Sequence, residues 1–291
     1  MALNWAMQIM HDFDVVLGMH NRGISISGIR SFRINMETAD AFSSDLKKIR
    51  PDIVIHCAGL ANVELCEADP ELAHQVNVHL SVNVAQCCKE QNIQLVYIST
   101  DHLFSGHHPL VTEEELPSPV NVYGKTKLEA EQRILDISDT NLSIRTNFYG
   151  WGPSYRQSFS DMIIQNNRNG KAVSLFDDFF YTPILIAELA RSVMSLLHLD
   201  AKGIFNVTGN ERISKYEFGL RLVKRFGLNG SLVNAGKFSD RKDLVKRPGD
   251  LSLSNKKLVT FLNRPVGDIN ENIQRLYQQE QDGLSTIIRN L

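Results

Sequence analysis

The sequence predicts an α/β protein with a Rossmann-like, doubly wound parallel sheet and a smaller C-terminal lobe. Three observations support this prediction. Short runs rich in β-branched residues alternate with stretches of helical periodicity through the first half of the chain. A chain of 291 residues with 43% hydrophobic side chains can bury a large core. Small or polar residues follow the predicted strands, where parallel sheets bind their ligands.

The predicted elements alternate in the order that such a sheet requires. Strands are expected over 13–19, 52–57, 93–99 and 142–145, and helices over 38–50, 70–91, 123–135, 184–198 and 215–226. In the long helix over 70–91, apolar residues recur every four positions, which predicts one buried face. These residues are Leu72, Val76, Leu80 and Val84.

The pattern changes after Gly150, where Gly, Pro, Asn and aromatic residues become frequent. We therefore predict one lobe over residues 1–150 and a second over 151–291, interleaved with the first. No repeat or Gly/Ser linker separates them.

Composition excludes several classes of protein. The chain has 31 Lys+Arg against 33 Asp+Glu, a net charge of -2, and no dense basic block, which argues against nucleic-acid binding. No apolar run approaches the length that a membrane span needs, and the first ten residues lack the features of a signal peptide. The four cysteines fit no metal or disulfide pattern, so we expect reduced thiols, no metal and a cytoplasmic location.

Three motifs are expected at the carboxyl ends of the strands. Ser99-Thr100-Asp101 follows the strand over 93–99, and its hydroxyls could donate to a substrate oxygen, although a polar turn would look the same. His56-Cys57-Ala58-Gly59 ends the strand over 52–57, where small residues let a flat cofactor approach, although an ordinary tight turn also fits.

The third motif is a Tyr and a Lys four residues apart. Tyr123 and Lys127 share one face of the helix over 123–135. A neighbouring cation is expected to lower the pKa of the phenol, which would make this pair a tuned general acid. A bare Y-x-x-x-K also occurs by chance, but here it opens the helix that follows the Ser-Thr strand.

Taken in order, these motifs resemble the extended short-chain dehydrogenase/reductase superfamily. The sequence is most similar to the dTDP-4-dehydrorhamnose reductase family of sugar-nucleotide-binding proteins. The resemblance runs over most of the chain and is carried by residues 51–59, 63–67, 76–77, 99–104, 119–127 and 247–248, together with Leu253 and 257–258.

The resemblance implies roles for individual residues. Lobe 1–150 would bind NAD(P), and lobe 151–291 would mainly bind substrate. The catalytic residues would be Thr100, Tyr123 and Lys127. The cofactor would contact Arg22, Cys57, Ala58, Gly59, Asn77, Ser99, Tyr123 and Lys127. The substrate would contact Asp101, Phe104, Asn147 and Arg247, with the Arg247 guanidinium suited to a diphosphate.

The sequence departs from the family pattern at its beginning. The family opens with a strand and a G-x-x-G-x-x-G turn, and neither is present. Residues 1–10 already resemble the helix after that turn, so the neighbouring strands are expected to lack a central partner. Either the natural protein starts further upstream, which we favour, or the chain is a shortened member with weakened cofactor binding.

Other departures bear on specificity. Leu60-Ala61, His102 and the segment 178–184 differ from the family pattern, which leaves the sugar open. After the second strand of the family pattern, Arg22 suits the 2′-phosphate of NADP, so NADP is favoured over NAD, although a solvated loop arginine fits equally well.

The leading functional hypothesis is NAD(P)H-dependent reduction of a nucleotide-linked 4-keto sugar, as in dTDP-rhamnose, deoxysugar and polysaccharide precursor synthesis. A second hypothesis is a non-catalytic regulatory subunit that binds a sugar nucleotide or NADP, as the beta subunit of methionine adenosyltransferase is in this family. A third is a sugar-nucleotide epimerase or dehydratase. The expected partners are a nucleotide-sugar substrate and, as one option, a second copy in a homodimer.

Overall fold

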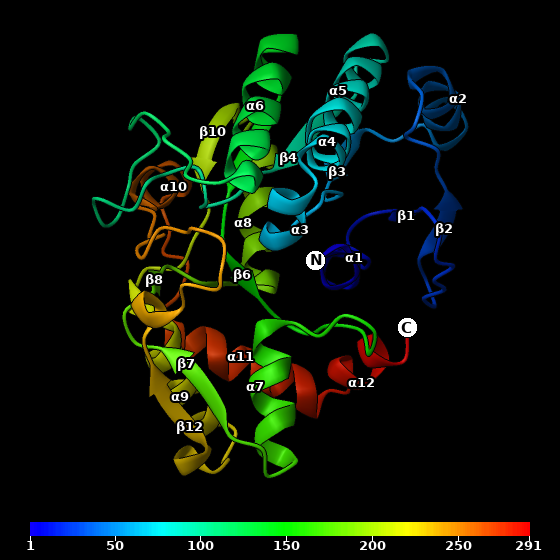
Figure 1. Cartoon of the computed structure of the whole chain (residues 1–291). Helices are drawn as coiled ribbons and strands as arrows, with labels where there is room; N and C mark the ends of the chain where they lie inside the picture. The colour runs from blue at the N-terminus through cyan, green and yellow to red at the C-terminus, as the bar shows by residue number, and fades with distance from the viewer.

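The computed structural model describes all residues from Met1 to Leu291 and has two lobes (Figure 1). The strands are β1 (Val16–Met19), β2 (Arg30–Arg33), β3 (Ile53–His56), β4 (Gln94–Ile98), β5 (Leu142–Arg145), β6 (Phe148–Tyr149), β7 (Val173–Phe176), β8 (Phe180–Tyr181), β9 (Ile184–Leu185), β10 (Gly203–Asn206), β11 (Ile213–Ser214) and β12 (Val233–Gly236).

The helices alternate with these strands in the first lobe and surround the small sheets of the second. They are α1 (Ala2–Ile9), α2 (Ala39–Ile49), α3 (Val63–Ala68), α4 (Pro70–His74), the π-helix η1 (Gln75–His79), α5 (Leu80–Glu90), α6 (Val122–Ile137), α7 (Phe159–Arg168), α8 (Ile186–His198), α9 (Lys215–Arg225), the 3₁₀ helices η2 (Gly230–Leu232) and η3 (Phe238–Asp240), α10 (Lys256–Leu262), α11 (Ile269–Gln281) and α12 (Leu284–Arg289).

The first lobe is built on a four-stranded sheet in the order β10-β5-β4-β3. All of its strand pairs are parallel. The predicted parallel α/β architecture is therefore confirmed, and the strand predicted over 142–145 has the bounds of β5. Because β10 comes from the second half of the chain, the two lobes share the polypeptide rather than dividing it at one point.

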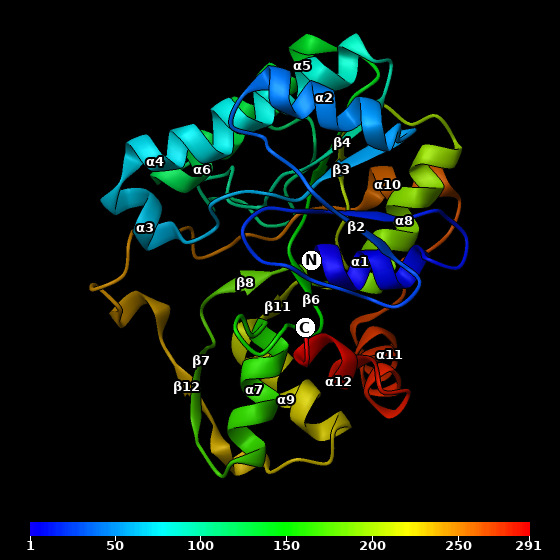
Figure 2. The same cartoon turned by 90° about the vertical axis from the view of Figure 1, so that its right-hand side faces the viewer.

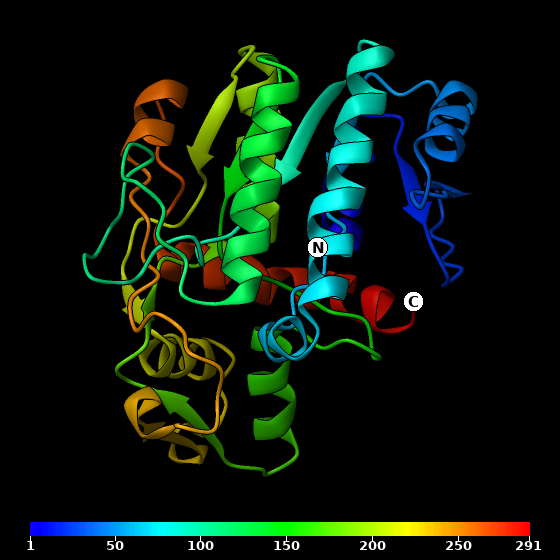
Figure 3. The ribbon, with the colours of Figure 1, turned by 45° about the horizontal axis from the view of Figure 1, so that its top comes forward.

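Strand β4 shows why the sheet is covered on both faces. Its side chains alternate, as the period of two residues in a strand requires. Leu95 and Tyr97 pack with helices α5 and α6 in one cluster, and Val96 and Ile98 pack with α8 in another. All four side chains are buried. Figure 3 shows α5 and α6 side by side in front of the strands.

Strands β1 and β2 form a separate parallel pair. Neither is hydrogen-bonded to the four-stranded sheet, in which β3 is an edge strand. This arrangement agrees with the expectation that the strands flanking the family's first strand lack a central partner.

Helix α1 connects the two lobes (Figure 2). The ring of Trp5 is buried with β4, β5 and α8. The Asn4 amide donates to the carbonyl of Trp151 at 2.6 Å and accepts from the Trp151 N–H at 3.3 Å. The first helix is thus fixed to the segment that opens the second lobe.

The helix predicted over 70–91 is a run of three segments, α4, η1 and α5. The π-helical turn η1 shifts the buried face between the two α-helical segments. The predicted buried face is therefore wrong at its start, because Leu72 is 40% exposed. Ala73, Asn77 and Val78 are buried instead.

The second lobe has its own apolar core, formed mainly by α7, α9, α11, β7 and β12. Strands β12 and β7 are parallel, and β11 and β8 are antiparallel. Helix α8 and strand β10 lie between β8 and β11 in the sequence, but they belong to the core of the first lobe. No helix in the structure has both the length and the apolar character that crossing a bilayer requires.

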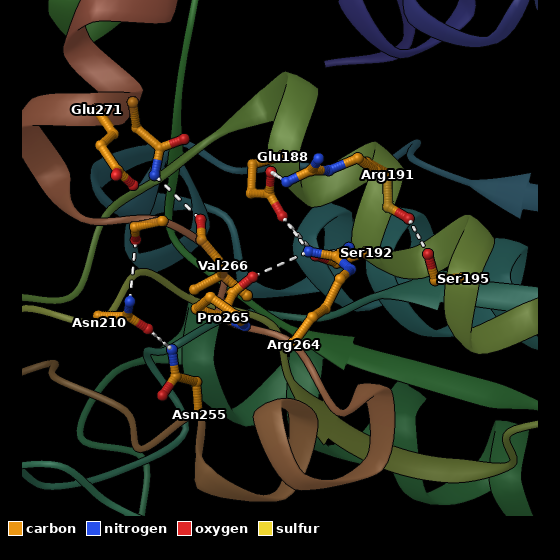
Figure 4. Close-up of polar contacts among 12 residues, drawn as sticks. Glu188, Arg191, Ser192, Ser195, Asn210, Asn255, Arg264, Pro265, Val266 and Glu271 are labelled. Atoms are coloured by element: carbon orange, nitrogen blue, oxygen red, sulfur yellow. Dashed lines mark hydrogen bonds and ion pairs between the residues drawn. The ribbon is translucent and has the colours of Figure 1, made fainter.

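A group of charged residues joins helices of the two lobes, and Figure 4 shows the part of it around Glu188, Arg191 and Arg264. Glu188 of α8 has a fully buried carboxylate that bonds to Arg191, Arg264 and Arg275. Arg264 follows α10, whereas Arg275 lies on α11, which packs in the second lobe.

Candidate active site

The predicted motifs meet at the carboxyl ends of three neighbouring strands. Strand β3 ends at His56, β4 at Ile98 and β5 at Arg145. The residues that follow are Cys57–Gly59, Ser99–Asp101 and Thr146–Asn147. In a parallel sheet these segments share one edge, which is where such folds bind ligands.

Helix α6 brings the Tyr-Lys pair to this edge. Asn121 caps the helix by accepting a hydrogen bond from the Gly124 N–H at 2.9 Å. The Tyr123 ring packs edge-on against His102, with ring centroids 5.4 Å apart. One turn later, the buried Lys127 ammonium donates to the Ile98 carbonyl at 2.8 Å and lies 4.0 Å from the centroid of the Tyr97 ring.

Burial controls the protonation of both members of this pair. It lowers the pKa of Lys127 to about 7, although Glu131 and Cys57 oppose the shift. It raises the pKa of Tyr123 to about 12, with the Thr100 hydroxyl opposing. The expected lowering of the tyrosine pKa is therefore wrong for this structure: burial of the phenol raises its pKa, and the group that opposes the rise is the Thr100 hydroxyl, not Lys127. Tyr123 stays protonated at neutral pH, as a proton donor must.

The Ser-Thr-Asp motif forms a buried hydrogen-bonded unit. The Thr100 hydroxyl donates to Asp101 Oδ1 at 3.2 Å, and the His102 N–H donates to Thr100 Oγ1 at 3.2 Å. The other oxygen, Asp101 Oδ2, accepts from the Asn147 amide at 2.6 Å. Because a hydroxyl has one proton, Thr100 can donate to a substrate carbonyl only when that proton turns away from Asp101.

Arg247 reaches the site from the second half of the chain. Its guanidinium pairs with Glu64 of α3, and its Nε is buried without a hydrogen-bond partner. The adjacent Lys246 carbonyl accepts from the Asn121 amide at 2.9 Å. The segment carrying Arg247 is thus held to the N-terminus of α6.

The residues expected to bind a dinucleotide line the end of β3. Ala58 and Gly59 are exposed and small. Asn77 holds the loop that follows by accepting from the Leu60 N–H at 2.7 Å and donating to the Leu60 carbonyl at 3.2 Å. The Ser99 hydroxyl is buried without a partner. An open surface of small residues beside unpaired donors fits the nicotinamide and ribose end of NAD(P).

Three predicted site residues have other contacts. Phe104 is 5% exposed and packs in an apolar cluster with Leu103, Val111 and Leu253, so packing accounts for its ring. The Arg22 guanidinium lies 3.7 Å from the centroid of the Tyr155 ring. Burial raises the pKa of the Cys57 thiol to about 11, which makes it a poor nucleophile.

Sequence reasoning missed Lys215 and assigned no role to His102. Burial lowers the pKa of both side chains. The charge of Asp101 opposes this shift and that of Arg247 adds to it. Lys215 opens α9, far from the motifs in sequence, and nothing in the residues around it indicates that it faces Asp101.

Comparison with known proteins identifies the family. The model of the RmlD substrate binding domain matches residues 14–281, which is most of the chain. The chain belongs to the RmlD substrate binding domain family. This confirms the resemblance to dTDP-4-dehydrorhamnose reductases, a family of the extended short-chain dehydrogenase/reductase type.

The proteins similar to this chain include both a subunit of another enzyme and reductases. Methionine adenosyltransferase 2 subunit beta of Rattus norvegicus is 30% identical over 237 residues, covering 79% of this chain and 70% of that protein. A hypothetical dTDP-4-dehydrorhamnose reductase from Sulfolobus tokodaii has a TM-score of 0.79 at 28% identity, covering 92% of this chain and 94% of its own.

A second solved structure shows the shared fold. The dTDP-4-dehydrorhamnose reductase of Bacillus anthracis, crystallised in complex with NADP, has a TM-score of 0.79 at 24% identity and covers 86% of this chain and 90% of its own.

Proposed function

We propose that this protein is an NAD(P)H-dependent reductase of a nucleotide-linked 4-keto sugar. The observation that carries the proposal is the protonated Tyr123 beside Thr100, with the Lys127 ammonium one helical turn away. Membership of the RmlD family supports this reaction class, and a related reductase crystallised with NADP supports the cofactor.

The residues divide the reduction into binding and proton transfer. A bound nicotinamide supplies the hydride that adds to the C4 carbonyl carbon. Tyr123 gives its phenolic proton to the C4 oxygen as that oxygen gains the electron pair of the breaking C=O bond. Thr100 donates a hydrogen bond to the same oxygen once its proton turns from Asp101, and Asn147 keeps Asp101 in place during that change.

Lys127 has two proposed tasks. Its ammonium already donates to the Ile98 carbonyl at 2.8 Å and has further protons for ribose hydroxyls. Burial lowers the pKa of Lys127 to about 7, so about half of the side chain is charged at neutral pH, and in that form it stabilises the phenolate that remains after Tyr123 gives up its proton. We retain Asp101, Asn147 and Arg247 as proposed substrate contacts, and Arg247 Nε is a buried donor without a partner. Phe104 is not retained, because its ring packs in an apolar cluster.

The test is a Tyr123→Phe substitution, assayed by NADPH oxidation with dTDP-4-keto sugars. We expect kcat to fall about 10²- to 10⁴-fold, the usual contribution of a positioned acid, while the folded state persists because the ring is retained. Tyr277→Phe is the matched control, because Tyr277 lies on α11 and its ring contacts Arg225 and Phe226 rather than any predicted site residue. Equal turnover by wild type and Tyr123→Phe would contradict the proposal.

A second candidate is a regulatory subunit, favoured by the 30% identity to methionine adenosyltransferase 2 subunit beta. This alternative predicts stable co-purification with a partner enzyme and no NADPH oxidation above that of Tyr123→Phe. Turnover that depends on Tyr123 decides for the reductase.

A further inference from the structure

Lys215, the first residue of α9, has an unusual environment. Its ammonium lies 3.5 Å from the centroid of the Tyr181 ring, 4.5 Å from that of Phe159 and 5.8 Å from that of Phe179. No oxygen of the chain bonds to it. Three aromatic rings can hold a cation by its attraction to their faces while leaving its N–H donors free for another group.

The charges that act on Lys215 belong to the candidate active site. Asp101 acts on it from the end of β4, and Arg247 acts on it from the second half of the chain. The charges of Asp101, Arg247 and Lys215 also act on the pKa of His102, whose ring contacts Tyr123.

Geometry also connects Lys215 to this site. Its ammonium contacts Tyr181, three residues before Ile184, whose N–H donates to the Asn147 carbonyl at 3.0 Å, and the Asn147 amide is bonded to Asp101. Lys215 therefore lies on the second-lobe side of the site that contains Asp101.

Unpaired donors surround this site. Arg247 Nε and the Tyr181 hydroxyl are buried without partners. Two carboxylates lie in the group: Asp101 is bonded to Thr100 and Asn147, and Glu64 pairs with one end of the Arg247 guanidinium. The Lys215 ammonium and the Arg247 Nε–H remain as donors without an oxygen partner, which matches a ligand that carries several anionic oxygens.

We propose that Lys215 is a substrate-binding residue that, together with Arg247, holds the diphosphate of the nucleotide sugar. The inference rests on the function proposed above and specifies how its substrate is bound. The ammonium acts as a mobile point charge on the phosphate oxygens, whereas the guanidinium adds a directional donor.

Binding to the full-length protein tests this proposal by isothermal titration calorimetry. The ligands are dTDP, UDP and NADPH, because the cofactor also contains a diphosphate. We expect Lys215→Met to weaken nucleoside diphosphate binding about tenfold or more, as loss of a charge-assisted hydrogen bond does, and to leave NADPH binding unchanged. Methionine should fold in this position because its flexible apolar chain suits an aromatic surrounding.

Two further variants serve as controls. Lys215→Arg keeps the charge and should recover most of the affinity. Lys224→Met removes a charge from an exposed position on the same helix and should change nothing.

The pH dependence of binding gives a readout that a merely structural role would not affect. Burial lowers the pKa of Lys215 to about 8, so its charge is lost as pH rises through that value. Wild-type affinity for dTDP should therefore fall above about pH 8, and the fall should be absent in Lys215→Arg. The groups facing Lys215 are Asp101, His102, Tyr181 and Arg247, and all are retained in that variant.

The outcomes separate this proposal from the proposed function. Tight binding of dTDP or UDP by wild type and by Lys215→Met alike would overturn the role of Lys215 and leave the reductase standing. A loss confined to NADPH would assign Lys215 to the cofactor instead, and a loss seen with a dTDP-hexose but not with dTDP would assign it to the sugar. Wild-type protein that binds neither diphosphate would overturn the proposed function and this inference together.

Discussion

The ion pair of Glu131 and Arg145 lies directly beneath the Tyr-Lys pair. Glu131 is one helical turn beyond Lys127, and Arg145 ends β5. Their side chains are 1% and 3% exposed, and Arg145 Nη2 donates to Glu131 Oε1 at 2.6 Å. The Ser143 hydroxyl donates to the other carboxylate oxygen at 2.8 Å. This pair fixes the orientation of α6 against the sheet.

Replacing Glu131 with Gln should leave the Arg145 charge buried without a partner. We expect the free energy of unfolding to fall by about 3–5 kcal/mol, the usual cost of breaking a buried pair. Guanidinium-induced unfolding measures this change. Glu129→Gln is the matched control on the same helix, because its contacts with Arg133 and His74 are partly exposed and each should be worth no more than about 1 kcal/mol. Equal losses in the two variants would show that burial does not govern the Glu131 pair.

Residue chemistry also limits what the sequence could predict. Tyr123, Lys127, Thr100 and Ser99 could be recognised because their spacing and order are local. The high pKa of Tyr123 could not be, because it depends on how completely surrounding elements exclude water from the ring.

Helix α6 approaches the loop after β4 as closely as its sequence permits. A Cβ atom at Gly124 would collide with the His102 carbonyl oxygen and would lie 2.9 Å from Pro119 Cβ. The first atom is backbone, so it cannot move aside without displacing the Ser-Thr-Asp segment. The absence of a side chain at Gly124 therefore sets the separation of Tyr123 from Thr100.

A Gly124→Ala substitution should push α6 away from this loop. We expect a loss of about 1–3 kcal/mol in unfolding free energy, as for other overpacked sites, and a fall in kcat at least as large as that in kcat/KM for NADPH. Thermal unfolding and steady-state kinetics measure the two effects. Gly230→Ala is the control, since nothing lies within 4 Å of its added methyl group. Unchanged kcat in Gly124→Ala would mean that the helix position does not matter for turnover.

At the level of elements, β3, β4, β5, α2, α6 and α8 lie in or close to their predicted ranges because each has a clear periodicity, whereas β2, α3 and β10 were not predicted. The predicted helix over 38–50 compares with α2 at Ala39–Ile49, and its C-terminal residue Arg50 has a φ of 53° before Pro51. The π-helical turn η1 was missed because the spacing of Leu72, Val76, Leu80 and Val84 suggests one regular helix, although Leu72 is exposed and Ala73, Asn77 and Val78 are buried. Lys215 was missed because its neighbours in space come from distant segments.

The two lobes are held together by charge as well as by the crossing chain. Glu188 lies on a helix of the first lobe, and two of its three arginine partners, Arg264 (Figure 4) and Arg275, come from beyond α10. The Ser192 hydroxyl also donates to its carboxylate at 3.2 Å. A single buried anion thus connects α8 to α11.

Neutralising Glu188 should lower the free energy of unfolding of the whole molecule. In Glu188→Gln three arginines would face one another without their anion, so we expect a loss of about 3–5 kcal/mol in unfolding free energy. Differential scanning calorimetry should show a lower melting temperature. Arg191→Met is the control, because Arg191 is half exposed and its loss leaves two partners for Glu188. A larger effect for Arg191→Met than for Glu188→Gln would contradict the central role of the carboxylate.

The π-helical turn η1 determines how the long helix would respond to the deletion of a single residue. An i→i+5 turn accommodates one residue more than an α-helical turn, so η1 can be viewed as a single-residue insertion kept inside a continuous rod. Asn77 lies in that turn, and its amide fastens the loop at Leu60. Deleting one residue there would let α4 and α5 close into a regular α-helix and would change the direction in which the Asn77 amide points. The position of the loop at Leu60, beside the proposed cofactor, thus depends on the extra residue that the π-helical turn contains.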